Sequence, residues 1–270
     1  MKKNLSFLII LFVLVSCSEN DTSKTEKLFV EAQTHYSENN FGVARILLDS
    51  IHKNFPRQVN FRRKADTLSW KMTVAEIESE LPNLDEQLKN ECYEAETIAK
   101  NFKFVKDEKY QTIGDYEHIS MSTAANAGRN YIKPITDEKG KFRFVSTAVG
   151  QKLEHCALRA TLETLSGETQ KATESDCYSY NDFGIIYETA LFNAENAKDF
   201  ILFLMQNSDS QIKITLLGNK EFSYNLSKKD VKTFCETFNF SLLLKNIAEN
   251  QAKKEKLERD YRYLSEKISS

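Results

Sequence analysis

The histidines and cysteines are the residues whose chemistry could build a catalytic or metal site in this chain. His118 has Asp115 and Glu117 beside it, and a histidine with carboxylates can bind a metal ion. We nevertheless expect His118 to be a solvated residue of a loop or strand. His155 directly precedes Cys156. Adjacent side chains on a strand point to opposite faces, so we do not expect these two to form a thiolate–imidazole pair.

Four cysteines follow the first apolar segment: Cys92, Cys156, Cys177 and Cys235. Cys156 and Cys177 both lie in a stretch with strand-like alternation, so they are the easiest pair to join by a disulfide in an oxidising compartment. The alternative is that they are buried free thiols, which behave as small apolar side chains. No C-x-x-C spacing occurs, so neither a thioredoxin-like site nor a zinc ribbon is indicated.

No other pattern in the sequence predicts catalysis or cofactor binding. The nucleophile elbow G-x-S-x-G, the phosphate-binding loop, H-E-x-x-H and the dinucleotide fingerprint are all missing. Four aromatic residues could form a platform that stacks on sugars, but we expect them to pack in the core and its rim: Tyr178, Tyr180, Phe183 and Tyr187. We therefore predict a non-enzymatic protein with no cofactor and no metal ion.

The N-terminus has the features of an export signal. Lys2 and Lys3 precede an apolar run, residues 5–15, of the length found in secretory signals. The run is too short for a transmembrane helix, which needs about 20 apolar residues. It ends in the sequence LVSC, whose cysteine is Cys17.

This ending resembles the lipobox of bacterial lipoproteins, in which a Leu stands three positions before an obligatory Cys with small residues between. The resemblance implies that residues 1–16 are a signal peptide and that the chain is cut before Cys17. It also implies that the Cys17 thiol is diacylated and that the new amino group receives a further acyl chain, such as palmitate. Several acyl chains anchor a protein stably where one binds only marginally. The alternative is an ordinary signal peptide that happens to end in Cys.

Residues 17–24 read as a flexible acidic tether, because a small and polar segment cannot pack a core. Lipoproteins of the Bacteroidota often carry acidic residues here as a surface-export signal, and Glu19 and Asp21 fit that pattern loosely. The resemblance implies a protein anchored by lipid in the cell envelope, on the outer membrane. Whether it faces the periplasm or the cell surface stays open.

The chain has the composition of a folded protein, with 41% hydrophobic and 28% charged residues. The net charge is only −2 and no half of the chain is basic, so we expect no nucleic-acid partner. The 8 Gly and 3 Pro are few for 270 residues, which predicts long regular elements and few tight turns.

Residues 25–56 predict two short helices in antiparallel contact. Apolar residues recur at helical spacing on both sides of the turn sequence SENN, and Ala32 and Ala44 are small enough to let the backbones approach. The hairpin resembles a tetratricopeptide repeat (TPR) and departs from it at Leu28 and His35. The matching positions are Ala32, Phe41, Ala44, Leu48, Ile51 and Pro56. Since one unit is visible, we expect a cap on the next helix and not a peptide-binding array.

Residues 57–104 predict one long helix with a seven-residue apolar repeat. The seam steps alternately by four and three residues: Trp70, Val74, Ile77, Leu81, Leu84, Leu88, Glu91, Ala95, Ile98 and Phe102. Such a repeat predicts a left-handed supercoil with a partner helix. Pro82 lies inside the repeat without changing its phase, so we expect a kinked helix and not two separate ones.

The partner helix is expected at residues 227–270. Ser227 and Asp230 have the spacing of a capping box that opens a helix, and apolar residues follow at helical spacing. The stretch from Glu249 to Lys256 is polar, so we expect the helix contact to lapse there, or this end to project alone. We favour an intramolecular pair over a homodimeric coiled coil, and the oligomeric state stays open.

Between the long helices, residues 105–226 change to a period of two. The segments KFRFVS, CALRATLE, FGIIYETALF and QIKITLL read as strands, and AENAKDFILFLMQN reads as one short helix. We therefore predict an α+β fold. In it, a TPR-like hairpin and two long antiparallel helices, paired like a coiled coil, flank a small antiparallel sheet or sandwich with one short helix.

The layout also resembles uncharacterised Bacteroidota envelope lipoproteins, which implies an envelope location and transfers no site residues. We expect a membrane-anchored scaffold that interacts with an envelope protein partner. One alternative is a surface lipoprotein that binds a glycan or a peptide. The other is an enzyme built on scattered polar residues such as Asp115 and His118.

Overall fold

The structure, a computed structural model, describes residues 4–173 and 176–270, and the side chains of residues 21–122, 125–173 and 176–270. Helix α1 (Asn4–Ser37) includes residues 4–16 of the predicted signal peptide and the predicted tether, residues 17–24. The side chain of Cys17 lies outside the described ones, so its lipidation stays a prediction. None of the helices in the described part of the chain combines the length and apolarity that crossing a bilayer requires.

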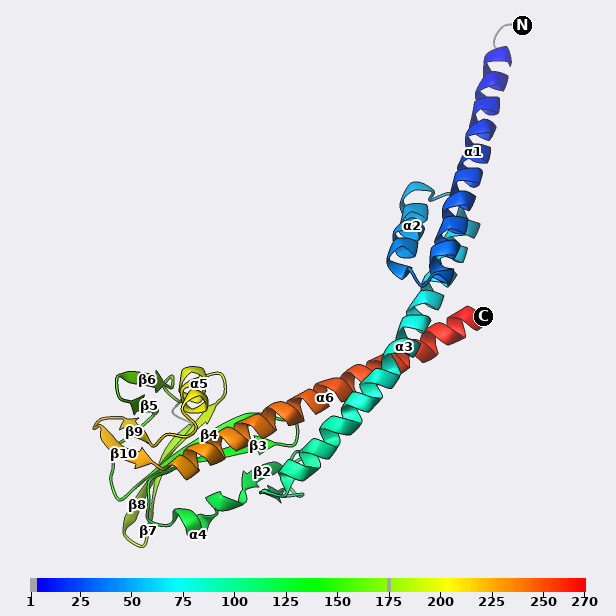
Figure 1. Cartoon of the computed structure of the whole chain (residues 1–270). Coiled ribbons are helices and arrows are strands. Elements are labelled where there is room, and N and C mark those ends of the chain that lie inside the picture. Colours follow the sequence, from blue (N-terminus) through cyan, green and yellow to red (C-terminus); the bar gives the residue numbers. More distant parts are fainter. Residues whose placement is uncertain (1–3, 174–175) are drawn as a thin grey trace. The chain divides into compact units, whose positions relative to one another are not determined.

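The chain divides into two compact units. Unit 1 contains the chain up to Glu86 together with Lys253–Ser270, and unit 2 is Gln87–Ala252. In unit 1, α1 lies beside α2 (Phe41–Asn54), and the long helix α3 (Val59–Ala99) follows (Figure 1). Helix α3 contributes residues to both units, because the division falls inside it.

The core of unit 1 forms where α1, α2 and the beginning of α3 meet. Ala32 of α1 and Ala44 of α2 are fully buried, and their small side chains allow the close approach of the two helices. The other buried apolar residues of this core are Leu48, Ile51, Ala65, Leu68 and Met72. At the turn between the helices the ring of Tyr36 stacks on Phe41, with 5.7 Å between ring centroids.

The last helix, α6 (Lys228–Ser269), contacts α3 through polar groups. Within unit 1, Lys254 Nζ lies 2.6 Å from a carboxylate oxygen of Asp85, and the Tyr261 hydroxyl donates to Glu78 at 3.1 Å. The lapse of contact expected from Glu249 to Lys256 does not occur at Lys253 and Lys254, whose side chains reach carboxylates of α3. Such exposed ion pairs contribute little stability, so they fix the register more than they hold the helices together.

The proline in α3 does not end the helix. Pro82 lies inside the continuous run from Val59 to Ala99, as the unbroken phase of the apolar seam predicted. The most buried seam positions lie on both sides of it: Ile77, Leu84, Leu88 and Ala95. The seam thus remains the buried stripe of this helix, although proline removes one backbone hydrogen bond.

Unit 2 holds a six-stranded antiparallel sheet with the strand order β1-β2-β3-β4-β8-β7. Its strands are β1 (Phe102–Val105), β2 (Asp115–His118), β3 (Tyr131–Asp137), β4 (Phe142–Val149), β7 (Cys177–Asp182) and β8 (Ile185–Asn193). Between β2 and β3 the chain forms the 3-10 turn η1 (Ile119–Met121) and the short α4 (Thr123–Asn126). Strand β7 is an edge strand, because it pairs only with β8 within this sheet.

A second antiparallel sheet in unit 2 has four strands in the order β10-β9-β5-β6. They are β5 (Ala157–Leu162), β6 (Leu165–Glu168), β9 (Ile212–Leu217) and β10 (Phe222–Leu226). The helix α5 (Lys198–Gln206) packs on β5 and β6. The chain passes from the six-stranded sheet to the four-stranded sheet at β5 and returns to the six-stranded sheet at β7. The segments next to these strands therefore connect the two sheets.

One aromatic core joins both sheets of unit 2 to α5 and α6. Phe144 of β4 is fully buried, and its ring stacks on Phe192 of β8 at 5.2 Å and on Phe200 of α5 at 5.5 Å. Phe234 of α6 meets Phe144 edge to face at 5.2 Å. Leu158 and Ile214 of the second sheet belong to the same cluster. The first half of α6 is therefore part of the core of unit 2 (Figure 1).

The start of α6 is fixed by a charged group at its first turn. Ser227 Oγ accepts from the Asp230 backbone N–H at 3.1 Å, which is one half of the capping box that the sequence predicted. The Arg129 guanidinium binds both carboxylate oxygens of Asp230, at 2.8 and 3.2 Å. Although burial acts to raise it, these hydrogen bonds from Arg129 and Ser227 hold the pKa of Asp230 below its ordinary value.

The predicted fold class is wrong about the β part of the chain. In place of a small sheet with one covering helix, the strands form sheets of six and four strands, and both α5 and α6 contribute to their common core. Several strands escaped the sequence analysis because they are short and largely polar, such as β2 and β6. Phe102, expected as the last seam residue of the long helix, begins β1 because α3 ends at Ala99.

Truncation of Phe234 tests the aromatic core of unit 2. Because this ring is only 1% exposed and packs on Phe144, Phe234→Ala should lower the free energy of unfolding by roughly 3–5 kcal/mol. Leu242→Ala on the same helix is the matched control, since Leu242 is 45% exposed and should lose far less. Denaturant unfolding followed by circular dichroism measures both. Equal losses in the two variants would contradict this core.

Candidate functional site

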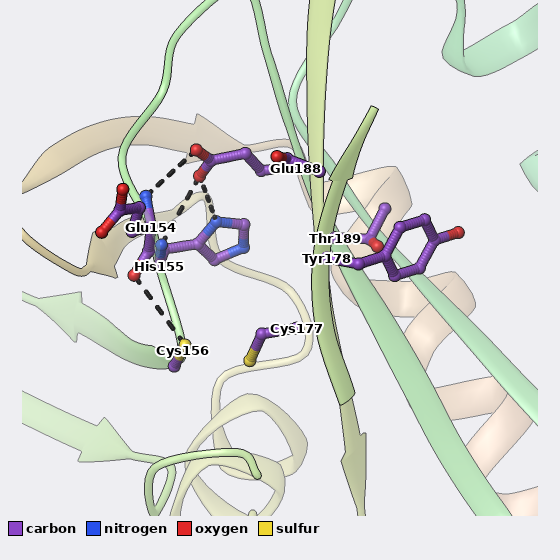
Figure 2. Close-up of a pocket in the computed structure, with 8 residues that line it drawn as sticks. Glu154, His155, Cys156, Cys177, Tyr178, Glu188 and Thr189 are labelled. Atoms are coloured by element: carbon purple, nitrogen blue, oxygen red, sulfur yellow. Dashed lines mark hydrogen bonds and ion pairs between the residues drawn. The ribbon is translucent and has the colours of Figure 1, made fainter. Parts of the chain in front are cut away.

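A pocket in unit 2 brings together Cys156, Cys177 and His155, the histidine that directly precedes Cys156 in the sequence. It has a volume of about 220 Å³ and lies between the segment that enters β5 and the β7–β8 pair (Figure 2). The residues that line it are Glu154, His155, Cys156, Cys177, Tyr178, Ser179, Glu188 and Thr189. One side of the pocket therefore comes from the irregular segment that enters β5, and the other from the β7–β8 pair of the six-stranded sheet.

The carboxylate of Glu188 organises this pocket. Glu188 lies on β8, is 3% exposed and accepts hydrogen bonds from the backbone N–H groups of Leu153 at 2.7 Å and Glu154 at 3.0 Å. Its other oxygen lies 3.3 Å from His155 Nδ1. Glu154 has a φ of 55°, a left-handed conformation that a non-glycine residue adopts at a cost. The carboxylate thus stabilises a tight bend of the chain just before Cys156.

His155 is buried and has partners at both ring nitrogens. Nδ1 faces Glu188, and Nε2 lies 3.3 Å from the Ser146 hydroxyl. Burial lowers the pKa of His155, against the opposing effect of Glu188, so the imidazole is neutral at physiological pH. Because both nitrogens are engaged, the ring holds the segment in place and is not free to take a proton from a neighbouring thiol.

Cys156 and Cys177 project into the pocket from its two sides (Figure 2). Both are half-buried free thiols. The Cys156 thiol donates to the carbonyl oxygen of Glu154 at 3.8 Å. Burial and, after it, the hydrogen bond with Cys156 raise the pKa of Cys177 to about 12. Cys177 therefore keeps its proton at neutral pH, unlike the thiolate that a nucleophilic cysteine requires.

His155 and Cys156 do not lie on a strand, so their side chains need not point to opposite faces. The structure places both residues in the irregular segment before β5, so both side chains reach the same pocket. They still form no thiolate–imidazole pair, because His155 is bound to Glu188 and Ser146. Of the other cysteines, Cys235 lies in the core beside the Leu204 carbonyl oxygen, and Cys92 lies on α3; neither lines this pocket.

The predicted surroundings of His118 are not assembled. Asp115 binds Arg143 and Glu117 binds Lys133, whereas His118 lies 2.8 Å from the Ser120 hydroxyl and 3.5 Å from Glu236. His118 is also buried and not solvated, since only 9% of it is exposed. Among the described residues, no three or more His, Cys, Asp or Glu side chains are grouped so that they could hold a metal ion.

The aromatic residues expected in the core lie instead on the surface of a hairpin. We call β7, its turn and the start of β8, residues 177–187, the tyrosine hairpin. Tyr178 and Tyr180 are 62% and 46% exposed. Tyr180 lies directly opposite Tyr187 in the ladder, and their rings stack at 5.2 Å. The expectation that these rings pack in the core and rim is therefore wrong for Tyr178, Tyr180 and Phe183.

The tip of the tyrosine hairpin carries an exposed aromatic ring in an unfavourable backbone conformation. Phe183 is 100% exposed, with a φ of 48°, and the next residue, Gly184, has a φ of 86°. Two successive positive φ angles form the tight turn typical of two-residue hairpins, which favours Asn or Gly at its first position. A phenylalanine there has no packing to offset its strain, and such outliers concentrate at functional sites.

Protonation of His155 predicts a pH dependence of stability. Because burial lowers the pKa of His155 from its ordinary value of 6.5, the unfolded chain takes up a proton that the folded chain does not as the pH falls through about 6.5. The free energy of unfolding should therefore decrease on acidification in this range. His155→Asn should flatten that decrease only in part, since burial also lowers the pKa of His118. Denaturant titrations at several pH values measure it, and an unchanged slope in the variant would contradict this role.

No protein-family model matches this chain, and the searches of curated proteins and of solved structures likewise found no match.

Proposed function

We propose that this chain is a non-enzymatic bacterial envelope lipoprotein, anchored through Cys17, that binds a partner protein through its tyrosine hairpin. The observation that carries the binding role is Phe183, a fully exposed ring at the tip of a hairpin whose neighbouring tyrosines are also exposed. An apolar ring in water, held in a strained turn, gains stability only when another surface covers it.

The composition of the hairpin supports a protein as the ligand. Tyrosine and other aromatic residues are enriched where protein interfaces bind most tightly, because they bury a large area and lose little conformational entropy. Tyr178, Tyr180 and Phe183 provide three such rings in one short segment. Since β7 is an edge strand, its outer backbone groups can also pair with an extended segment of the partner.

Ring geometry favours a protein over a glycan. Sugars bind to aromatic platforms by lying on ring faces, but Tyr180 is stacked on Tyr187 with 9° between the ring planes and on Tyr178 with 25°. The rings therefore partly cover one another, and their edges and hydroxyl groups remain for a ligand. Such edges suit the mixed apolar and hydrogen-bonding contacts of a protein interface.

The residues on which the enzyme alternative was based are engaged with other side chains. Asp115 and His118 bind different partners, Arg143 and Ser120, so they do not form one site.

The anchor rests on the lipobox ending at Cys17 and on the affinity that several acyl chains give. An envelope location places the hairpin among other envelope proteins, which agrees with a role as a scaffold.

Removal of the lipidated thiol tests the anchor. Cells expressing the full chain and fed with labelled palmitate should label it, and Cys17→Ser should carry no label and leave the membrane fraction, because no acyl chain can attach. Cys92→Ser is the matched control and should stay labelled. A Cys17→Ser chain that keeps its label and its membrane location would rule out this anchor.

Substitutions in the hairpin test the binding role. A photo-reactive phenylalanine analogue in place of Phe183 should cross-link one defined neighbour in native envelopes, and Tyr180→Ser should weaken the yield about tenfold or more. Tyr110 is the matched control, since it is 76% exposed but lies outside the hairpin. The same analogue at Tyr110 should not capture that neighbour. Equal capture from both positions, or none from Phe183, would refute the proposed surface.

A further inference from the structure

We propose that Cys156 and Cys177 form a disulfide bond that ties the four-stranded sheet to the six-stranded sheet. Cys156 directly precedes β5, and Cys177 is the first residue of β7. The bond would join strands that belong to different sheets, a connection that neither hydrogen-bonded ladder provides. It rests on the pocket of unit 2 alone and does not depend on the proposed anchor or partner.

The two cysteines already line one pocket. Their side chains project into it from its two sides (Figure 2). The backbone positions are anchored independently. Cys156 donates its N–H to the Leu217 carbonyl at 3.1 Å and accepts from the Ala172 N–H at 2.7 Å. Cys177 is held in the ladder opposite Ala190. The bond would therefore join two backbone segments that are each held in place, and whose cysteine side chains face the same pocket.

The surroundings suit a disulfide better than a catalytic or metal-binding thiol. The imidazole beside the pair is neutral and bound on both sides, so it cannot create a thiolate. The raised pKa of Cys177 has the same consequence. A disulfide requires no charged sulfur in the final state, so the half-burial of these two residues does not oppose it.

The reaction balances with a small disulfide as the oxidant. Since Cys177 keeps its proton, exchange begins at Cys156, which gives its proton to solvent. Its sulfur attacks one sulfur of the oxidant and forms a mixed disulfide, while the S–S bond of the oxidant breaks and the other sulfur leaves as a small thiolate that takes up a proton. Cys177 then loses its proton to solvent and attacks the Cys156 sulfur, which releases the second small thiol. Two protein thiols and one small disulfide become one protein disulfide and two small thiols. The rate should rise with pH because only a thiolate attacks.

The bond would restrict the chain between the two sheets. It closes a loop of about 20 residues that contains β5 and β6, and it fixes the beginning of β7, an edge strand of its sheet. A disulfide that closes a loop of this size reduces the entropy of the unfolded chain. This reduction should raise the melting temperature by roughly 5–10 °C in a protein of this length.

Oxidation of the purified full-length chain tests the bond. Incubation with oxidised glutathione, alkylation and tryptic digestion should yield a cross-linked pair of peptides containing Cys156 and Cys177, with the loss of two hydrogens. The melting temperature should rise with oxidation and fall again with dithiothreitol. Cys92→Ser should behave like the natural chain, whereas Cys177→Ser should show no reversible shift and should carry glutathione at Cys156.

Two outcomes would overturn the proposal. One is a chain in which both cysteines are alkylated, or separately joined to glutathione, after oxidation in the folded state. The other is a cross-link that forms only under denaturing conditions, or one whose reduction leaves the melting temperature unchanged. Both outcomes are measured on the natural chain, so a variant that fails to fold does not affect them.

Discussion

The buried carboxylate of Glu188 is the constraint on which the pocket depends. It draws the backbone N–H groups of Leu153 and Glu154 and the ring of His155 onto β8, and so it places the segment that crosses from one sheet to the other. A buried acceptor with several donors is worth more than the same contacts in water. Without it the left-handed bend at Glu154 would lose its support, and Cys156 would not face Cys177.

The β7–β8 pair serves two roles because strand residues alternate between faces. Cys177 faces the pocket on the core side, whereas Tyr178 points to the opposite side of the sheet (Figure 2). The pocket and the proposed interface thus share the backbone of β7, and Tyr178 borders both of them. The aromatic cluster around Phe144 packs against β8, because Phe192 of β8 belongs to this cluster. The β7–β8 pair is thus held rigid on its core-facing side and carries exposed rings on its other side.

Sequence patterns predicted the features that depend on local periodicity. The seam through α3, its passage across Pro82 and the capping of α6 by Ser227 follow from spacing alone. The assignment of strands to two sheets did not, because pairing depends on contacts between distant segments. Glu188 could have been found: in the segment IIYETALF it stands in phase with the core residues Ala190 and Phe192, and a charged residue in that position must have buried partners.

The unprotected edge of β7 has a consequence for the behaviour of the chain in concentrated solution. Natural proteins usually block an edge strand with lysine, proline or a bulge, and β7 has the sequence CYSYND, which contains none of the blocking residues. With Phe183 at its end, this strand is a template on which a second molecule can align its own edge. Crowding such molecules at high density therefore favours self-association unless something else occupies the edge first.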